Sequence, residues 1–89
     1  MANSVYKYPL KSSRDTILAL PIGAELLHVN VQNGGLFLWA KVDADESETE
    51  DRSIEVVGTG HSFPYGETSF INTILIKNGS VVLHAFERL

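Results

Sequence analysis

The feature that most constrains this chain is an alternation of side-chain types on both sides of Asn33-Gly34-Gly35, within the segment Leu26–Val42. Aliphatic side chains alternate with polar ones before the glycines and with mainly aromatic or polar ones after them. Such alternation about an Asn-Gly pair indicates a β-hairpin, because both central residues of the favoured two-residue turn need a positive φ. A period of two does not form one face of a helix. The segment therefore predicts two antiparallel strands.

The position of the turn decides the register of this hairpin. A turn at Asn33-Gly34 pairs Val31 with Leu36. A turn at Gly34-Gly35 pairs Val31 with Leu38 instead. Both registers keep the aliphatic side chains on one face, whereas a three-residue loop would mix the two faces. The sequence predicts an aliphatic face turned to the interior and leaves these two registers open.

The rest of the chain contains further short segments with β-forming residues, bounded by turn residues. They are Ser4–Leu10, Thr16–Leu20, Arg52–Val57, Thr68–Lys77 and Ser80–Arg88, the last two forming a second hairpin about Asn78-Gly79. No segment has a helical period over about 10 residues. Seven short strands separated by turn signals predict one all-β domain over residues 1–89, a small antiparallel β-sandwich or flattened barrel.

Composition limits the class of protein. With 89 residues, 44% hydrophobic and 20% charged, the chain suits one small globular domain. It has no cysteines, which excludes disulfides and thiolate zinc sites and fits a reducing compartment. No apolar run approaches the roughly 18 residues of a membrane-spanning helix, and the first residues do not resemble a signal peptide. We therefore expect a cytoplasmic protein without membrane contact.

The net charge of −4 is distributed unevenly. Acidic residues concentrate between Asp43 and Asp51, a stretch in which no apolar residue is larger than Ala44. This charge density predicts a solvated acidic loop over residues 43–51. The remaining sequence shows no basic stripe, so we do not expect general nucleic-acid binding. A small anionic ligand needs only a few well-placed cations and remains compatible with this composition.

Five phrases distributed along the chain carry a resemblance to known proteins. They are VYKYPL at Val5–Leu10, LPIGAELLHVNVQNG at Leu20–Gly34, LWAKVD at Leu38–Asp43, GTGH at Gly58–His61 and VVLHAFE at Val81–Glu87. They are similar to a family of short, functionally uncharacterised all-β proteins encoded by bacteriophages and prophages. The resemblance implies a viral accessory protein in the cytoplasm of a bacterial host, and it implies no reaction. Small phage proteins often inhibit or sequester a host component.

The mixed face of the central hairpin is the first candidate binding surface. On this face Trp39 and a neighbouring lysine stand beside an imidazole and two amides, and opposite side chains on paired strands lie about 5 Å apart. A flat aromatic ring beside amide groups and a cation suits a nucleobase or nucleotide, by stacking on Trp39 and hydrogen bonding through Asn30. The alternative is a solvent-facing strand whose tryptophan covers the sheet. The residues of this face are His28, Asn30, Gln32, Phe37, Trp39 and Lys41.

The turn-rich loop Gly58–Glu67 is the second candidate. Its glycines allow backbone N–H groups to converge on an anion, with Thr59, Gly60 and His61 as the contacting residues. The glycine spacing matches neither a dinucleotide fingerprint nor a phosphate loop. The alternative is a purely structural loop.

Arg52 is the third candidate, because it flanks a strand end where a guanidinium can clamp a phosphate bidentately. Its alternative role is a surface ion pair with Asp51 or Glu50. We expect no metal and no cofactor, since the histidines occupy separate strands and a loop. We expect no catalysis either, since no nucleophile motif is present.

Together these observations predict a non-catalytic binding protein that sequesters a host small molecule or blocks a host protein. Its sharpest form is a host-defence inhibitor that captures a nucleotide immune signal. The second hairpin is apolar on both faces, which predicts either a central place in a sheet or a homo-oligomer contact. Alternatives are a small virion decoration or assembly protein, and a nucleic-acid mimic acting through the acidic loop. The expected ligand-binding residues are Asn30, Trp39, Arg52, Thr59, Gly60 and His61.

Overall fold

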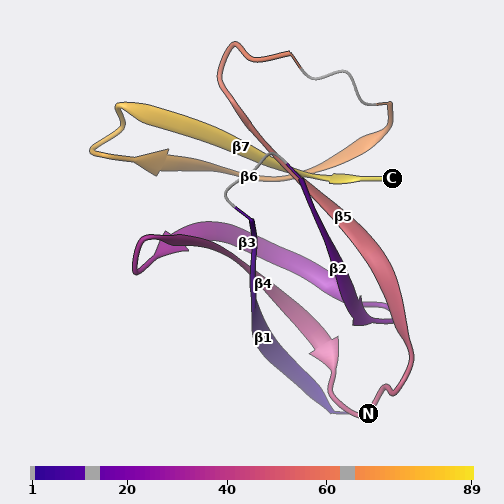
Figure 1. Cartoon of the computed structure of the whole chain (residues 1–89). Helices are drawn as coiled ribbons and strands as arrows, with labels where there is room; N and C mark the ends of the chain where they lie inside the picture. The colour runs from indigo at the N-terminus through magenta and orange to yellow at the C-terminus, as the bar shows by residue number, and fades with distance from the viewer. Residues whose placement is uncertain (1, 12–14, 63–65) are drawn as a thin grey trace.

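The fold is all-β, and it is known from a computed structural model that describes residues 2–11, 15–62 and 66–89. A three-stranded sheet has the order β1-β4-β3 and a four-stranded sheet the order β2-β5-β7-β6, both antiparallel (Figure 1). Across the described ranges there is no helix long and apolar enough to cross a membrane. The predicted all-β sandwich is confirmed. The strands are β1 (Asn3–Pro9), β2 (Asp15–Pro21), β3 (Glu25–Gln32), β4 (Gly35–Asp43), β5 (Thr49–Gly58), β6 (Thr68–Ile76) and β7 (Val81–Arg88).

The central hairpin, β3–β4, turns at Asn33-Gly34. Val31 lies opposite Leu36, and the φ angles of Asn33 and Gly34 are 52° and 82°. Positive φ at both central residues fits the favoured two-residue turn, whose twist matches that of the flanking strands. Of the two registers that the sequence left open, the chain adopts the one that this turn requires.

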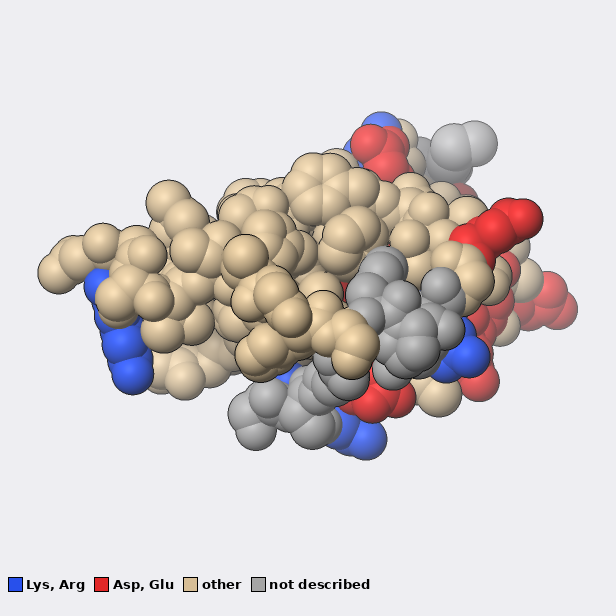
Figure 2. Space-filling model, turned by 90° about the horizontal axis from the view of Figure 1, so that it is seen from above, with Lys and Arg blue, Asp and Glu red and all other residues tan. Residues whose placement is uncertain are grey.

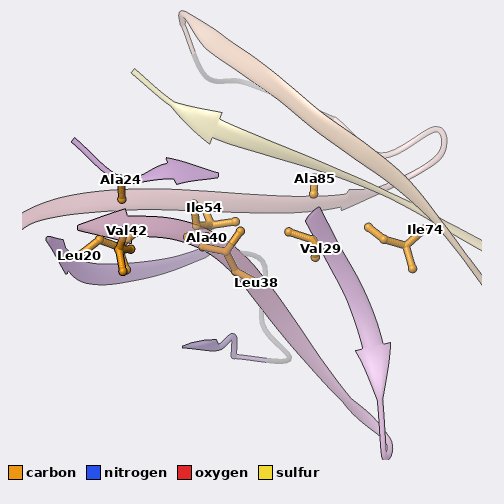
Figure 3. Close-up of a cluster of buried hydrophobic side chains, with 9 residues drawn as sticks. All are labelled: Leu20, Ala24, Val29, Leu38, Ala40, Val42, Ile54, Ile74 and Ala85. Atoms are coloured by element: carbon orange, nitrogen blue, oxygen red, sulfur yellow. The ribbon is translucent and has the colours of Figure 1, made fainter. Parts of the chain in front are cut away.

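The hydrophobic core lies between the two sheets. Strand β4 contributes the alternate residues Leu38, Ala40 and Val42, as the period of two requires, and burying one large aliphatic side chain contributes roughly 1.5–3 kcal/mol. The same alternation that forms the strands therefore also holds the sheets together. The buried cluster consists of Leu20, Ala24, Val29, Leu38, Ala40, Val42, Ile54, Ile74 and Ala85 (Figure 3).

An amide side chain joins the two sheets where β3 meets β6. The Oδ1 atom of Asn72 accepts a hydrogen bond from the Val29 N–H at 2.7 Å, and its Nδ2 group donates to the Val29 carbonyl at 2.8 Å. Asn72 thus pairs with the edge of β3 as a peptide group of a neighbouring strand would. Register shifts lie beside both partners, between Leu26 and His28 and between Phe70 and Asn72. Such bulges bend a strand locally.

Strand β5 begins inside the stretch that the sequence predicts as an acidic loop over residues 43–51. It starts at Thr49, and Glu50 and Asp51 lie opposite Leu20 and Ala19 of β2. The connection between β4 and β5 is therefore only residues 44–48. Backbone hydrogen bonding to β2 explains the difference, because exposed acidic side chains do not prevent the main chain from joining an antiparallel ladder.

The second hairpin, β6–β7, is partly central in its sheet. Strand β7 lies between β5 and β6, whereas β6 lies at an edge. The connection between them spans residues 77–80, with positive φ at Lys77, Asn78 and Gly79. The two-sided apolar pattern thus reflects a central position for β7. For β6 it leaves Leu75 67% exposed on the outer side.

Candidate functional site

Trp39 lies at the centre of the outer face of the three-stranded sheet. It belongs to the middle strand, β4, and its neighbours in β4, Leu38 and Ala40, are buried on the inner side. Side chains directly opposite each other on paired strands point to the same face. The outer face therefore includes the rows Val5-Lys41-Glu25, Lys7-Trp39-His28 and Pro9-Phe37-Asn30, with Asn3-Asp43 at one end.

Contacts between side chains order this outer face. The Lys7 ammonium lies 4.6 Å from the centroid of the Phe37 ring and donates a hydrogen bond to Gln32 Oε1 at 2.7 Å. The rings of Phe37 and Trp39 are 6.3 Å apart and inclined at 58°. A cation over an aromatic ring contributes about 0.5–1 kcal/mol at an exposed site. The half-buried Trp39 ring is therefore supported by its neighbours and remains partly open to solvent.

The outer face carries two lysines, Lys7 and Lys41, and two carboxylates, Glu25 and Asp43. Lys41 lies 3.5 Å from Glu25, with side chains 48% and 63% exposed. An exposed pair of this kind contributes under about 1 kcal/mol, so a ligand can displace it at little cost. Asn30 accepts a hydrogen bond from the Val31 N–H at 2.8 Å through its Oδ1 atom. The face thus offers ammonium groups beside a central indole.

Arg52 lies away from this face, on the inner side of β5. Its guanidinium makes a two-pronged ion pair with Glu87 of β7, in which the Nη2–Oε1 distance is 3.0 Å and Nε bonds Oε2. Its Nη1 donates to the Ala24 carbonyl at 2.9 Å and lies 3.5 Å from Glu50. The hydrogen bond to Glu87 raises the pKa of Arg52 above its usual value. The donors expected to clamp a phosphate are thus occupied by the protein, with Glu50 only a secondary partner.

The segment Thr59-Gly60-His61 is a structural turn. The Thr59 N–H donates to the Val82 carbonyl at 3.2 Å, and the His61 N–H donates to the Gly58 carbonyl at 3.1 Å. Gly60 has a φ of 85°, and a Cβ atom at Gly58 would lie 3.2 Å from the His61 ring. Two of the N–H groups expected to converge on an anion are therefore used within the protein. Residues 63–65 of the predicted loop lie outside the described residues.

A polar cluster surrounds His84, which was not among the ligand-binding residues predicted from the sequence. Its Nε2 lies 2.7 Å from the Thr59 hydroxyl, and its Nδ1 lies 3.1 Å from the Thr73 hydroxyl. Thr73 lies directly opposite His84 in the β6–β7 ladder, so this contact is local to the hairpin. The contact with Thr59 arises only from the tertiary fold. Within the described ranges, no group of histidine and acidic residues is placed to hold a metal ion.

The predicted ligand-binding residues thus fall into separate regions. Asn30 and Trp39 share the outer face of the three-stranded sheet, in adjacent rows. Arg52 faces the gap between the sheets, and Thr59-Gly60-His61 follow β5 at the other sheet. Because β1 pairs with β4, Lys7 also lies on this outer face, beside Trp39. Lys7 was not among the predicted ligand-binding residues. The outer face is the region where predicted residues come together.

Comparison with known proteins identifies the family. A model described as a domain of unknown function (DUF7352) matches residues 1–89, so the chain belongs to this family. No curated protein and no solved structure matches the chain. The description of the family assigns it no activity.

Proposed function

We propose that this DUF7352 protein is a non-catalytic binding protein that captures a small molecule on the outer face of its three-stranded sheet. The observation that carries the proposal is the position of Trp39, half-buried at the centre of that face between Lys7 and His28. Binding hot spots typically combine a central tryptophan with a surrounding polar rim. Sites built on strands are also held more rigidly than sites on loops.

The ligand that suits this face combines a planar ring with an acidic group. Stacking of a base on an aromatic side chain contributes about 1–3 kcal/mol. Lys7 is already ordered beside the aromatic pair by its contacts with Phe37 and Gln32, so little side-chain entropy is lost when an anion binds. A nucleotide, and in the sharpest version a nucleotide immune signal, meets both requirements.

The biological setting in this proposal is a bacteriophage protein in the cytoplasm of its bacterial host. The setting is supported by the resemblance of phrases such as LWAKVD and VVLHAFE to phage and prophage proteins. A second version of the same proposal is that the outer face blocks a host protein. In both versions the protein sequesters its target and catalyses no reaction.

A second candidate function is a virion decoration or assembly role, with contacts made by the four-stranded sheet. Its outer side exposes large apolar side chains, with Ile17 at 63%, Phe70 at 59% and Leu75 at 67%. Exposed apolar patches commonly mark protein–protein contacts. The same surface would serve a homo-oligomer.

Thermal unfolding with a panel of cyclic and linear nucleotides tests the first candidate. We expect at least one nucleotide to raise the melting temperature, because a ligand that binds only the folded state stabilises it. The substitution Trp39→Ala should lower the affinity for that nucleotide about tenfold to a hundredfold, because one stacking contact is lost. The matched variant Phe70→Ala removes an exposed aromatic ring from the other sheet and should bind normally.

Two outcomes would contradict the proposal. One is that no nucleotide in the panel changes the melting temperature. If the protein also co-purifies with virus particles, that result would favour the assembly role. The other is equal nucleotide binding by the Trp39→Ala variant and the unmodified protein.

A further inference from the structure

Strand β2 lies at one end of the four-stranded sheet and carries peptide groups that point away from the protein (Figure 1). In an antiparallel ladder, hydrogen-bonded residue pairs alternate with pairs whose N–H and C=O groups point to the opposite side. The Ile22 N–H donates to the Glu48 carbonyl at 3.1 Å, in step with the regular β2–β5 register. The even-numbered residues of β2 therefore bond β5, and the peptide groups of Ile17 and Ala19 point outward.

The corresponding edge of β3 is closed by amide side chains. Asn72 bonds both the outward N–H and the outward carbonyl of Val29, at 2.7 and 2.8 Å. The Oδ1 atom of Asn30 accepts a hydrogen bond from the Val31 N–H at 2.8 Å. Because Asn72 belongs to β6, its hydrogen bonds also hold β6 against β3. These two edge strands therefore protect each other.

The open edges of β1 and β2 differ in composition. Lys7 and Pro9 occupy outward positions of β1, and a lysine or a proline at a sheet edge opposes pairing with another chain. Between Thr16 and Leu20, β2 has neither a charged residue nor a proline, and Ile17 is 63% exposed. Among the residues that the structure describes, none bonds the outward N–H of Ile17 or Ala19. Strand β2 is therefore the edge that is open to a further strand.

We infer that β2 pairs with β2 of a second copy of this chain, in the antiparallel sense. With a two-fold axis at Leu18, Ile17 of each copy lies opposite Ala19 of the other, and the two residues exchange both of their peptide hydrogen bonds. Each large Ile17 side chain then lies beside a small one, and its exposed surface is covered. The pairing joins the two four-stranded sheets into one continuous sheet.

The distribution of charge favours a second copy in this orientation. The acidic connection between β4 and β5 lies at the Pro21 end of β2, where Ile22 bonds Glu48, and the Asp and Glu side chains visible in Figure 2 gather mainly toward the right-hand end. Antiparallel pairing places these acidic ends at opposite ends of the dimer. Arg52, which lies opposite Leu18, would be three strand spacings, about 14 Å, from Arg52 of the second copy. That separation exceeds the screening length of about 8 Å at physiological salt.

Sedimentation velocity of the full chain over a series of concentrations tests this inference. We expect a reversible equilibrium between monomer and dimer. Ala19→Pro should raise the dissociation constant at least about thirtyfold, because two backbone hydrogen bonds are lost from each dimer. Proline is tolerated at an edge position whose N–H faces solvent, so this variant should keep the fold. Val5→Pro is the matched control, because it makes the same change at an outward position of β1 and should dimerise normally.

Amide hydrogen exchange gives a second test that needs no variant. In the unmodified protein, the N–H groups of Ile17 and Ala19 should be protected at high concentration and should exchange faster on dilution. The N–H of Val5, which points outward from β1, should exchange rapidly at both concentrations.

The inference is overturned if the chain is a monomer at every concentration, if Ala19→Pro dimerises as the unmodified protein does, or if exchange at Ile17 and Ala19 does not depend on concentration. A dimer that is dissociated by Leu75→Ser and not by Ala19→Pro would place the contact on the outer apolar side of the four-stranded sheet instead. Trp39→Ala should dimerise normally, because Trp39 belongs to the other sheet. Failure here therefore leaves the small-molecule proposal standing.

Discussion

Polar side chains in the gap between the sheets have different partners from those on the outer face of the three-stranded sheet. In the gap, Arg52 bonds Glu87, and Asn72 bonds the backbone of Val29, over sequence separations of 35 and 43 residues. On the outer face, Lys41 contacts Glu25, which lies opposite it in the ladder. Asn30 accepts a hydrogen bond from the N–H of the next residue of its own strand.

The difference shows which polar groups remain for a ligand. Groups removed from water must form hydrogen bonds inside the protein, because an unpaired buried polar group costs about 1–3 kcal/mol. Arg52 is therefore used by the fold, although its position at a strand end suggests a ligand clamp. The exposed groups around Trp39 carry no such requirement, so they can exchange water or weak partners for a ligand.

The largest expected effect is the loss of folding stability when the guanidinium of Arg52, which lies between the two sheets, is removed. Arg52→Met should destabilise the protein by about 3 kcal/mol, because breaking a largely buried ion pair leaves a charge without compensation. The side chains of Arg52 and Glu87 are only 18% and 13% exposed. Lys41→Met, the matched change on the outer face, should cost less than about 1 kcal/mol. Urea unfolding measures both, and equal losses would remove the contrast between the regions.

The next effect concerns the amide that joins the sheets. Asn72→Leu should cost about 2 kcal/mol, because it removes two hydrogen bonds and leaves the Val29 N–H and carbonyl without them. Asn30→Leu loses one exposed hydrogen bond and should change stability by less than about 1 kcal/mol. Amide hydrogen exchange at Val29 should become faster in the Asn72 variant alone. Unchanged exchange there would mean that β3 and β6 are held together by other contacts.

The smallest effect is expected at the half-buried Asp43. Hydrogen bonds from the backbone N–H groups of Ala2 and Asp45, at 3.2 and 3.0 Å, hold the pKa of Asp43 below its usual value of 3.8. A carboxyl whose pKa is lowered by folding stabilises the protein above the unfolded-state pKa, and this contribution is lost as pH falls through the folded-state pKa.

Asp43→Asn should therefore be slightly less stable than the unmodified protein at neutral pH, and the two should converge below the usual pKa of the carboxyl. Urea midpoints at about pH 6 and about pH 2 measure this difference. A gap between the two proteins that persists in acid would show that the hydrogen bonds from Ala2 and Asp45 do not depend on the charge of the carboxyl.

The strand pattern was predictable where side-chain burial alternates. The sequence limited the β3–β4 register to two alternatives, both of which place His28, Asn30 and Trp39 on one face, and the structure selects the one with the turn at Asn33-Gly34. The start of β5 was not predictable from burial, because Glu50 and Asp51 join the ladder through their backbone alone. The pairing of Arg52 with Glu87 was not predictable from the sequence either, because it requires β5 and β7 to be neighbours.

The sequence by itself determined that this chain forms short antiparallel ribbons with one aliphatic side, because alternation and turn chemistry act within a few residues. Only the tertiary structure decided which ribbons became neighbours. Antiparallel pairing of strands remote in sequence put β1 beside β4 and β5 beside β7, which brought Lys7 to Trp39 and Glu87 to Arg52. The cost of closing a loop rises only slowly with its length, so sequence distance alone selects no partner.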